Sequence, residues 1–182
     1  MILVVDMNSE ANSFGFSEFV LPILAIAEEL EKCTVKRYFE VNEKDLNGCD
    51  KIFLSGSALK NTVTLSQTTR FQWLRDCGKP VLGICAGMQT ISLFFGGGLV
   101  KCREIGMTKI VTLKENLLFS SSFKAYTLHN YAIVPSAEFE ALAESANCVQ
   151  AIKHRQKDIY GVLFHPEVRN SEVIQRFIQS FP

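Results

Sequence analysis

The chain has 182 residues, a length typical of one domain with a sizeable buried core. Lysine plus arginine number 19, as do aspartate plus glutamate, so the formal net charge is zero. This balance argues against binding to nucleic acid or to an anionic membrane, both of which favour a basic surface. We therefore expect small molecules or proteins as partners, and one domain spanning residues 1–182.

The first residues and the cysteines bear on where the protein resides. Residues 1–6 are largely apolar but too short for a membrane span, and no basic segment precedes them as in a secretory signal. We therefore expect a cytoplasmic protein. The six cysteines include no Cys-x-x-Cys pair, which argues against a zinc ribbon or a redox motif. In this setting free thiols are expected.

Apolar runs alternate with helical periods in the first half of the chain, which is typical of an α/β sheet covered on both faces. Residues 1–6 predict a central strand because nearly all of them are apolar. Residues 17–30 carry apolar side chains at helical spacing, with Pro22 expected near the first turn or at a kink. Further strands are expected at residues 35–39, 51–54 and 79–82, and a helix at residues 66–76.

After the three glycines at residues 96–98, shorter strand-like pieces follow one another. They lie at residues 108–113, 124–128, 132–134, 149–154 and 158–164. Asn170 or Ser171 is expected to cap a last helix. That helix should bury four apolar side chains: Val173, Ile174, Phe177 and Ile178.

The residues around Cys85 predict a nucleophile elbow. Residues 83–89, Gly-Ile-Cys-Ala-Gly-Met-Gln, follow a predicted strand and precede a helix-like run. In such a turn the reactive side chain occupies a sharp corner, and Gly83 and Gly87 are expected to leave the thiol exposed. The helix N-terminus would favour the thiolate. The alternative is a buried strand end in which the cysteine acts as a small hydrophobic residue.

A histidine and a carboxylate follow the last predicted strand. In extended backbone, His165 and Glu167 would point to the same side, with Pro166 stiffening the segment. An imidazole oriented by a carboxylate can take a thiol proton and pass it to a leaving group. Gly56, Cys85 and His165 all follow predicted strands, whose carboxyl ends bind ligands in parallel sheets. The sequence therefore predicts a Cys85–His165–Glu167 triad.

Residues 83–89 together with residues 160–168, Tyr-Gly-Val-Leu-Phe-His-Pro-Glu-Val, resemble the class I glutamine amidotransferases. Segments between residues 133 and 154 are most similar to the glutaminase part of the GMP synthases. The similarity extends over almost the whole chain. It implies a flavodoxin-like, three-layer α/β fold, with a mostly parallel central sheet, helices on both faces and a small antiparallel addition.

The resemblance implies hydrolysis of L-glutamine to glutamate and ammonia through a thioester on Cys85. His165 would protonate the departing ammonia and then activate water. The tetrahedral oxyanion needs hydrogen-bond donors already in place. The implied donors are the backbone N–H of Ala86 and an N–H within Gly56-Ser57.

The resemblance also implies residues that bind the substrate. Gln89 matches a position that helps to bind the amino-acid end of glutamine, although an ordinary polar helix residue is the alternative. Three residues that flank His129 match positions where relatives hold glutamine through backbone groups: Leu128, Asn130 and Tyr131. His129 itself ranks below His165, because no carboxylate stands beside it in the sequence.

The chain departs from the family pattern in several places. Residues 55–58 read Ser-Gly-Ser-Ala where relatives have Ser-Gly-Gly-Pro, and residues 128–131 read Leu-His-Asn-Tyr where GMP synthases have Ser-His-x-Asp. Leu163 replaces a glutamine, and residues 7–10 do not reproduce a Gly-Ser-Gln-Tyr-like turn. These differences leave the three triad residues in place, and they leave the acceptor of the ammonia open.

The sequence contains no Ser-Gly-Gly-x-Asp-Ser pyrophosphatase loop. The resemblance therefore implies that ammonia passes to a separate synthetase subunit. ATP and Mg²⁺ are expected only in that partner, and neither a cofactor nor a metal in this chain. Two alternatives stay open: a γ-glutamyl hydrolase with the same triad, and a catalytically inactive paralogue that regulates a partner. Cysteine-elbow stress proteins have a similar sheet but lack the His-Pro-Glu motif.

Overall fold

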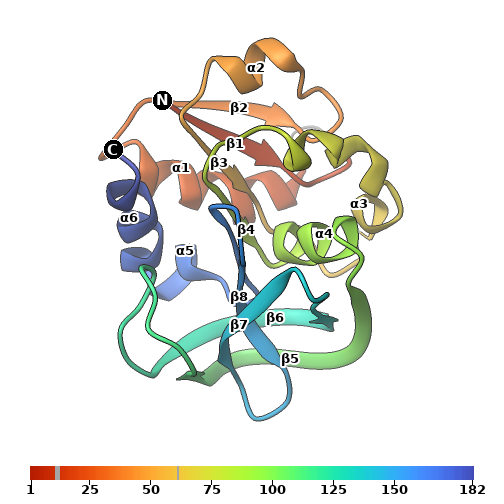
Figure 1. Ribbon diagram of the computed structural model, residues 1–182, viewed down its shortest axis with the longest axis vertical. Coiled ribbons are helices and arrows are strands. Elements are labelled where there is room, and N and C mark those ends of the chain that lie inside the picture. Colours follow the sequence, from red (N-terminus) through yellow and green to blue (C-terminus); the bar gives the residue numbers. More distant parts are fainter. Residues whose placement is uncertain (11–12, 61) are drawn as a thin grey trace.

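The computed structural model describes residues 1–10, 13–60 and 62–182. In this part of the chain, nine strands form one sheet in the order β2-β1-β3-β4-β9-β8-β7-β5-β6 (Figure 1). The strands are β1 (Ile2–Asp6), β2 (Cys33–Arg37), β3 (Lys51–Leu54), β4 (Val81–Ile84), β5 (Gly98–Thr112), β6 (Phe123–Val134), β7 (Phe139–Glu144), β8 (Val149–His154) and β9 (Ile159–Val162). Neighbours from β2 to β9 are parallel, and neighbours from β9 to β6 are antiparallel.

Helices cover both faces of the parallel part. The π-helical turn η1 (Phe16–Val20) leads into α1 (Leu21–Ala27), which packs beside α6 (Ser171–Ser180) on one face. The other face carries α4 (Ala86–Phe94) and the 3₁₀ helix η2 (Thr68–Arg75). Three short helices complete the set: α2 (Glu43–Asn47), α3 (Val63–Ser66) and α5 (Pro166–Arg169). The expected α/β fold class is confirmed.

Strand β1 lies inside the sheet, between β2 and β3, as its apolar sequence predicted. Ile2 and Val4 belong to the core beneath α1 and α6, whereas Leu3 and Val5 belong to the core beneath α4 and η2. Successive side chains alternate between the two faces of a strand, and here both faces are buried. That double burial is why the strand reads as a continuous apolar run.

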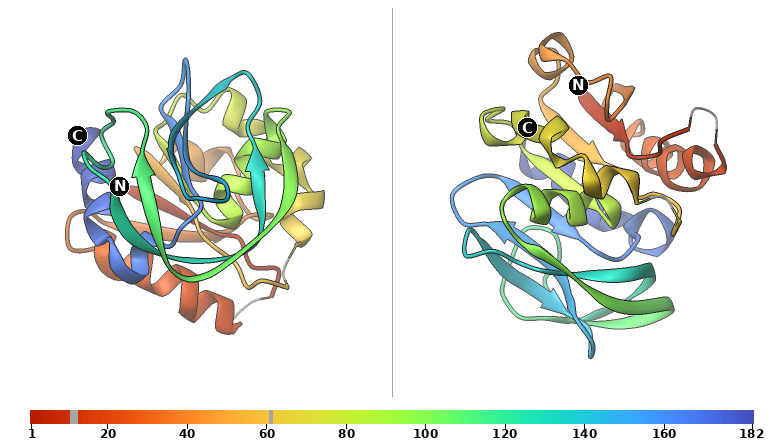
Figure 2. Two further views of the ribbon diagram at one scale, coloured as in Figure 1. Left: turned by 90° about the horizontal axis from the view of Figure 1, so that it is seen from below. Right: turned by 90° about the vertical axis from the view of Figure 1, so that its right-hand side faces the viewer.

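The antiparallel strands lie together at one end of the molecule, away from α2 and β2 (Figure 2). The pieces predicted at residues 108–113, 124–128 and 132–134 belong to two long strands, β5 and β6, and β7 was not predicted. Much of β5 is exposed or half-buried, with few buried residues. Its apolar signal is therefore weak, whereas buried β3 and β8 match their predicted ranges.

The helices differ from the prediction mainly at their boundaries. The helix expected over residues 17–30 ends at Ala27, and Pro22 lies in the first turn of α1, where an N–H is not needed. The helix expected over residues 66–76 is α3 followed by η2, which is broken at Phe71. Asn170 precedes α6 without a capping side-chain hydrogen bond, but the four expected core residues of α6 are buried.

Two further expectations concern thiols and membranes. All six cysteines are free thiols, as expected. Among the helices of residues 1–10, 13–60 and 62–182, none is long and apolar enough to cross a membrane. The strand predicted at residues 35–39 is shifted toward the N-terminus and forms β2.

Candidate active site

Cys85 is the single residue between strand β4 and helix α4. The strand continues through Gly83 and Ile84, two residues further than residues 79–82 predicted. Among the non-glycine residues that the structure describes, only Cys85 has a positive φ, 49° with ψ −103°. Non-glycine residues adopt this region rarely and at an energetic cost, which is typical of functional sites. The backbone thus forms the sharp corner that the elbow motif predicted.

Gly83 and Gly87 allow the close approach of α4 to the sheet. A Cβ atom on Gly83 would lie 2.6 Å from the carbonyl carbon of Gly87, and one on Gly87 would lie 2.5 Å from the oxygen of Leu54. Because both obstacles are backbone atoms, neither position has room for a side chain. The glycines do not expose the thiol, contrary to the expectation from the motif, since Cys85 is only 4% exposed.

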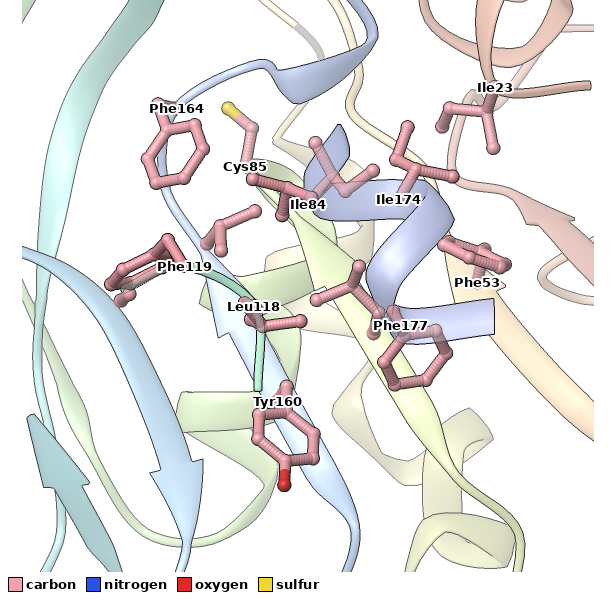
Figure 3. Close-up of a cluster of buried hydrophobic side chains, with 14 of the residues drawn as sticks. Ile23, Phe53, Ile84, Cys85, Leu118, Phe119, Tyr160, Phe164, Ile174 and Phe177 are labelled. Carbon is pink, nitrogen blue, oxygen red and sulfur yellow. The ribbon is translucent and has the colours of Figure 1, made fainter. Parts of the chain in front are cut away.

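Cys85 lies at the edge of a buried apolar cluster, together with Ile84 and Phe164 (Figure 3). Its backbone N–H donates to the carbonyl of Val162 at 2.8 Å, which ties the elbow to the end of β9. Its Sγ donates to the carbonyl oxygen of Leu128 on β6, 3.6 Å away. The thiol is therefore placed between two strands that are distant in sequence.

His165 and Glu167 form a buried pair. His165 Nδ1 lies 2.7 Å from Glu167 Oε1, and the two side chains are 1% and 0% exposed. Extended backbone is not what brings them together: Pro166 begins helix α5, so Glu167 occupies its first turn. The predicted proximity is correct, but its geometric reason was wrong, because a strand-to-helix turn replaces the expected strand.

Three neighbours fix the position of the His165 ring. The backbone N–H of His165 donates to the carbonyl of Tyr126 at 2.8 Å. The ring of Phe19 lies 5.3 Å away, centroid to centroid. A Cβ atom on Gly56 would come within 2.9 Å of His165 Cε1, so the absence of a side chain at Gly56 makes room for the imidazole.

The electrostatic environment favours a charged imidazole. Burial lowers the pKa of His165, but the Glu167 carboxylate and Cys85 raise it by more, and the pKa lies well above the ordinary value. His165 Nε2 is buried and makes no hydrogen bond to the described residues. With Nδ1 held by Glu167, the second nitrogen is the one left to exchange protons with a neighbour.

One cavity beside Cys85 collects most of the sequence-predicted site residues. Seven of them line it: Ser57, Cys85, Ala86, Gln89, Leu128, Asn130 and Tyr131. Five further residues complete its wall: Ala58, Leu59, Thr62, Leu65 and His129. No motif pointed to Leu59, Thr62 or Leu65. The cavity measures about 20 Å³, room for a water molecule and little more.

Three predicted residues outside the triad differ in how they relate to this cavity. Gln89 donates from Nε2 to the carbonyl oxygen of Tyr131 at 2.7 Å, so α4 and β6 are tied across the cavity. Gly56 does not line the cavity and instead lies against His165. Ala86 is the first residue of α4, where the backbone N–H has no partner within the helix.

His129 has a carboxylate beside it, contrary to the expectation from its sequence neighbours. Its Nε2 lies 3.3 Å from Glu104 Oε2, because Glu104 on β5 pairs directly with His129 on β6. Burial lowers the pKa of His129, although the carbonyl of Cys102 and the Glu104 carboxylate act in the opposite direction. This contact was not predicted because Glu104 and His129 are 25 residues apart in the sequence. The contact depends on the register between β5 and β6, which was not predicted in full.

A comparison with protein-family models matches residues 18–181 to the glutamine amidotransferase class-I family. The chain therefore belongs to this family. It is 34% identical over 178 residues to one subunit of the glutamine-hydrolyzing GMP synthase of Methanocaldococcus jannaschii, covering 92% of this chain and 84% of the relative. The corresponding protein of Thermoplasma acidophilum is 31% identical over 150 residues, 78% of this chain and 75% of that one.

Solved structures agree with this assignment. A Thermoplasma acidophilum protein, described as a GMP synthase subunit, superposes with a TM-score of 0.83 at 26% identity, covering 98% of this chain and 93% of that one. A glutamine amidotransferase from Thermotoga maritima superposes with a TM-score of 0.72 at 17% identity, over 100% of this chain and 82% of that one. The second comparison supports the fold alone.

Proposed function

We propose that this protein hydrolyses L-glutamine to glutamate and ammonia, with Cys85 as nucleophile, His165 as proton carrier and Glu167 as the group that orients it. The observation that carries the proposal is the buried His165–Glu167 pair, 2.7 Å apart, beside a cysteine held at a strained strand-to-helix corner. Membership of a family of glutamine amidotransferases supports enzymatic activity. Under this proposal, the corner supplies the nucleophile, and the pair supplies a proton carrier and the carboxylate that orients it, as thiol catalysis requires.

In the first half of the reaction, His165 takes the proton of Cys85, and the sulfur attacks the carboxamide carbon of glutamine. The oxyanion that forms would accept hydrogen bonds from the N–H of Ala86 and from an N–H within Gly56-Ser57. Loss of one such donor typically costs about 3–4 kcal/mol of transition-state stabilisation. His165 then protonates the departing nitrogen, ammonia leaves, and a γ-glutamyl thioester remains on Cys85.

In the second half, water attacks the thioester carbon. His165 accepts a proton from that water and returns it to the sulfur as the thioester bond breaks. Glutamate leaves, and Cys85 is regenerated as a thiol. Glu167 holds Nδ1 of His165 and supports the charged imidazole, consistent with the raised pKa of His165.

Gln89, Leu128, Asn130 and Tyr131 are proposed to hold the substrate. Leu128 already accepts a hydrogen bond from the nucleophile, and Gln89 already binds the backbone of Tyr131, so the cavity wall is built around polar backbone groups. The carboxamide of glutamine would enter the cavity that these residues line beside Cys85.

The ammonia is proposed to pass to a separate, ATP-dependent synthetase subunit. The relatives are themselves named as subunits of GMP synthases, which supports an assembly of two different chains, and GMP synthesis is the proposed use of the ammonia. ATP and Mg²⁺ would bind that partner, and the chemistry assigned to this chain needs no cofactor. Activity in the cytoplasm is part of the same proposal.

The direct test is release of glutamate and ammonium from glutamine, with and without a candidate synthetase subunit. We expect turnover that increases when the partner is present. A diazo-oxo-norleucine probe should label a peptide containing Cys85, found by mass spectrometry. The half-buried Cys77 is the matched control: Cys77→Ala should retain labelling, and Cys85→Ala should lose it.

Two results would overturn the proposal. Faster cleavage of γ-glutamyl peptides than of free glutamine would identify a γ-glutamyl hydrolase. Absence of both labelling and turnover, with the partner bound, would identify an inactive paralogue that acts through its partner.

A further inference from the structure

A second group of polar side chains lies in the antiparallel part of the sheet and reaches the cavity wall at His129. Glu104 on β5, His129 on β6 and Cys148 before β8 place one oxygen, one nitrogen and one sulfur atom within 4.8 Å of one another. Glu104 and His129 are buried, and Cys148 is half-buried. None of the three is needed for the proposed hydrolysis of glutamine.

Glu104 is the one carboxylate of this cluster, and among the described residues no lysine or arginine pairs with it. Within the part of the chain that the structure describes, the ion-pair partner of Glu104 is His129. His129 Nδ1 lies 3.0 Å from the carbonyl oxygen of Cys102, so Nδ1 must carry a proton to donate. A neutral ring then directs the lone pair of Nε2 toward Glu104 Oε2. The group that faces both acceptors is the amide nitrogen of Gln150, 2.7 Å from Glu104 Oε2 and 3.5 Å from His129 Nε2.

Gln150 occupies the centre of the cluster. Its Nε2 lies 2.7 Å from Glu104 Oε2, 3.3 Å from Cys148 Sγ and 3.5 Å from His129 Nε2. The side chain is fully buried, and its Oε1 has no hydrogen-bond partner among the described residues. A half-turn of the amide group would exchange the two ends and direct Oε1 into the cluster.

Four of five separations between the resulting atoms are those of a tetrahedral metal site. Metal–ligand bonds of about 2.0–2.3 Å imply separations of about 3.3–3.7 Å between ligand atoms. Glu104 Oε2 lies 3.3 Å from His129 Nε2 and 3.7 Å from Cys148 Sγ. The turned amide oxygen of Gln150 would take over the separations of 3.3 Å from Cys148 Sγ and 3.5 Å from His129 Nε2. Its separation of 2.7 Å from Glu104 Oε2 is shorter than this range, so metal binding requires the amide to move away from that oxygen.

We propose that Glu104, His129, Cys148 and Gln150 bind a divalent transition metal of the zinc class. A carboxylate and a thiolate would neutralise the two charges of the ion, while imidazole and amide add neutral ligands. The Cys102 carbonyl that holds His129 Nδ1 is the kind of outer contact that orients a metal-binding histidine. The ion would join β5, β6 and β8 next to the substrate-binding residues Leu128 and Asn130.

The test is titration of metal-stripped protein with Co²⁺ in a Cys85→Ser background, which removes the candidate catalytic thiol. We expect one equivalent to bind with visible tetrahedral bands and a thiolate-to-cobalt charge-transfer band, both lost when Zn²⁺ is added. Cys148→Ser should abolish the charge-transfer band and weaken binding by more than about 100-fold, since even outer contacts are worth 10–100-fold. Gln150→Glu should retain binding, and Gln150→Leu should weaken it.

Controls separate this site from other thiols. Cys49→Ser removes a buried thiol elsewhere, and Cys102→Ser removes the nearby thiol while keeping the carbonyl that binds His129; both should retain the band. If Cys148→Ser does not fold, His129→Gln gives the same test through loss of affinity. No stoichiometric binding, or a band that survives Cys148→Ser, would overturn the proposal. Cobalt binding is measured without glutamine hydrolysis. The metal-site proposal can therefore fail while the proposed glutaminase activity holds, and the reverse.

A second measurement asks whether the ion holds the sheet together. A ligand that binds only the folded state raises the midpoint of thermal unfolding, and the rise grows with the logarithm of the free ligand concentration relative to its Kd. We expect stoichiometric Zn²⁺ to raise Tm and Mg²⁺ to have no effect, because thiolate and imidazole ligands do not favour Mg²⁺. Gln150→Leu should show a smaller Zn²⁺-dependent rise. Equal shifts with both ions would contradict the assignment.

Discussion

His165 Nδ1 lies 2.7 Å from Glu167 Oε1 although Pro166, which separates the two residues, begins a helix. The turn places both side chains in the interior, where each is almost completely shielded from water. A buried imidazole held at one nitrogen by a carboxylate has a fixed tautomer and a stabilised charged form. The proposed catalytic role of His165 therefore depends on Glu167.

The first prediction concerns the pKa of His165 itself. The Glu167 carboxylate and Cys85 both raise this pKa, so Glu167→Gln and Cys85→Ser should each lower it. NMR titration of the imidazole resonances measures the value directly, and the chain contains only two other histidines. His154, which contacts Glu138, serves as the internal control and should titrate as in the unsubstituted protein. An unchanged His165 pKa in Cys85→Ser would show that the thiol does not act on the ring.

The second prediction is a pH dependence of stability. A histidine whose folded-state pKa is raised contributes its full stabilisation below the unfolded value of about 6.5, and loses it as the pH rises through the folded value. The test compares the single variant Cys85→Ala with the double variant Cys85→Ala/Glu167→Gln by urea unfolding. Because both lack the thiol, their difference reports the His165–Glu167 pair alone. We expect the difference in unfolding free energy to be greatest between about pH 5 and 6.5 and to shrink at higher pH. A difference in unfolding free energy that grows with pH would contradict a raised His165 pKa in the folded protein.

The third prediction concerns the kinetics of Glu167→Gln. The amide cannot stabilise the charged imidazole, so proton transfer to and from His165 should slow. General acid–base groups contribute about 10²–10⁴-fold, and we expect a fall of that size in kcat with a small change in KM. Glutamate release measures it. Glu172→Gln, an exposed residue on the next helix, is the matched control and should stay near the unsubstituted rate.

Much of the parallel half of the fold was predictable because its signals are local. Strand β3 is buried on both faces, and its boundaries were predicted correctly. The elbow at Cys85 was also local, since a strand, a cysteine between small residues and a helix follow one another. Burial and backbone geometry can be predicted from the sequence where adjacent residues determine them.

The rest depended on pairing between distant segments. Long, half-exposed β5 lacks a strong apolar period, so its extent and its pairing with β6 were missed. The contact of Glu104 with His129 follows from that register alone. The burial of Cys85 depends in part on packing against residues far along the chain, such as Phe164. No window of neighbouring residues contains this information.

The fourth prediction uses the strained backbone of Cys85. Its φ of 49° costs a non-glycine residue about 1–3 kcal/mol, a cost that glycine does not have. Cys85→Gly and Cys85→Ala both lack the sulfur and should both lack glutaminase activity. Cys85→Gly should nevertheless be more stable than Cys85→Ala by about 1 kcal/mol, after allowance for the greater freedom of unfolded glycine. Thermal and urea unfolding measure the difference, and a more stable alanine variant would contradict it.

The fifth prediction concerns the space that Gly56 leaves for His165. A methyl group at position 56 would lie 2.9 Å from His165 Cε1 and 3.1 Å from a carbon of the Phe19 ring, so one of the rings must move. Displacement of a catalytic group by about 1 Å can cost about 100-fold in rate. We therefore expect Gly56→Ala to lower kcat by about 10–100-fold and to shift the His165 resonances.

Gly98→Ala is the matched control for this substitution. The nearest atom to its added methyl group is a carbon of Val134 at 3.8 Å, an ordinary contact that requires no displacement. This variant should keep both the rate and the His165 resonances. Reduced activity in Gly56→Ala with unshifted His165 resonances would indicate that the methyl group acts on the proposed oxyanion donors, rather than on the imidazole.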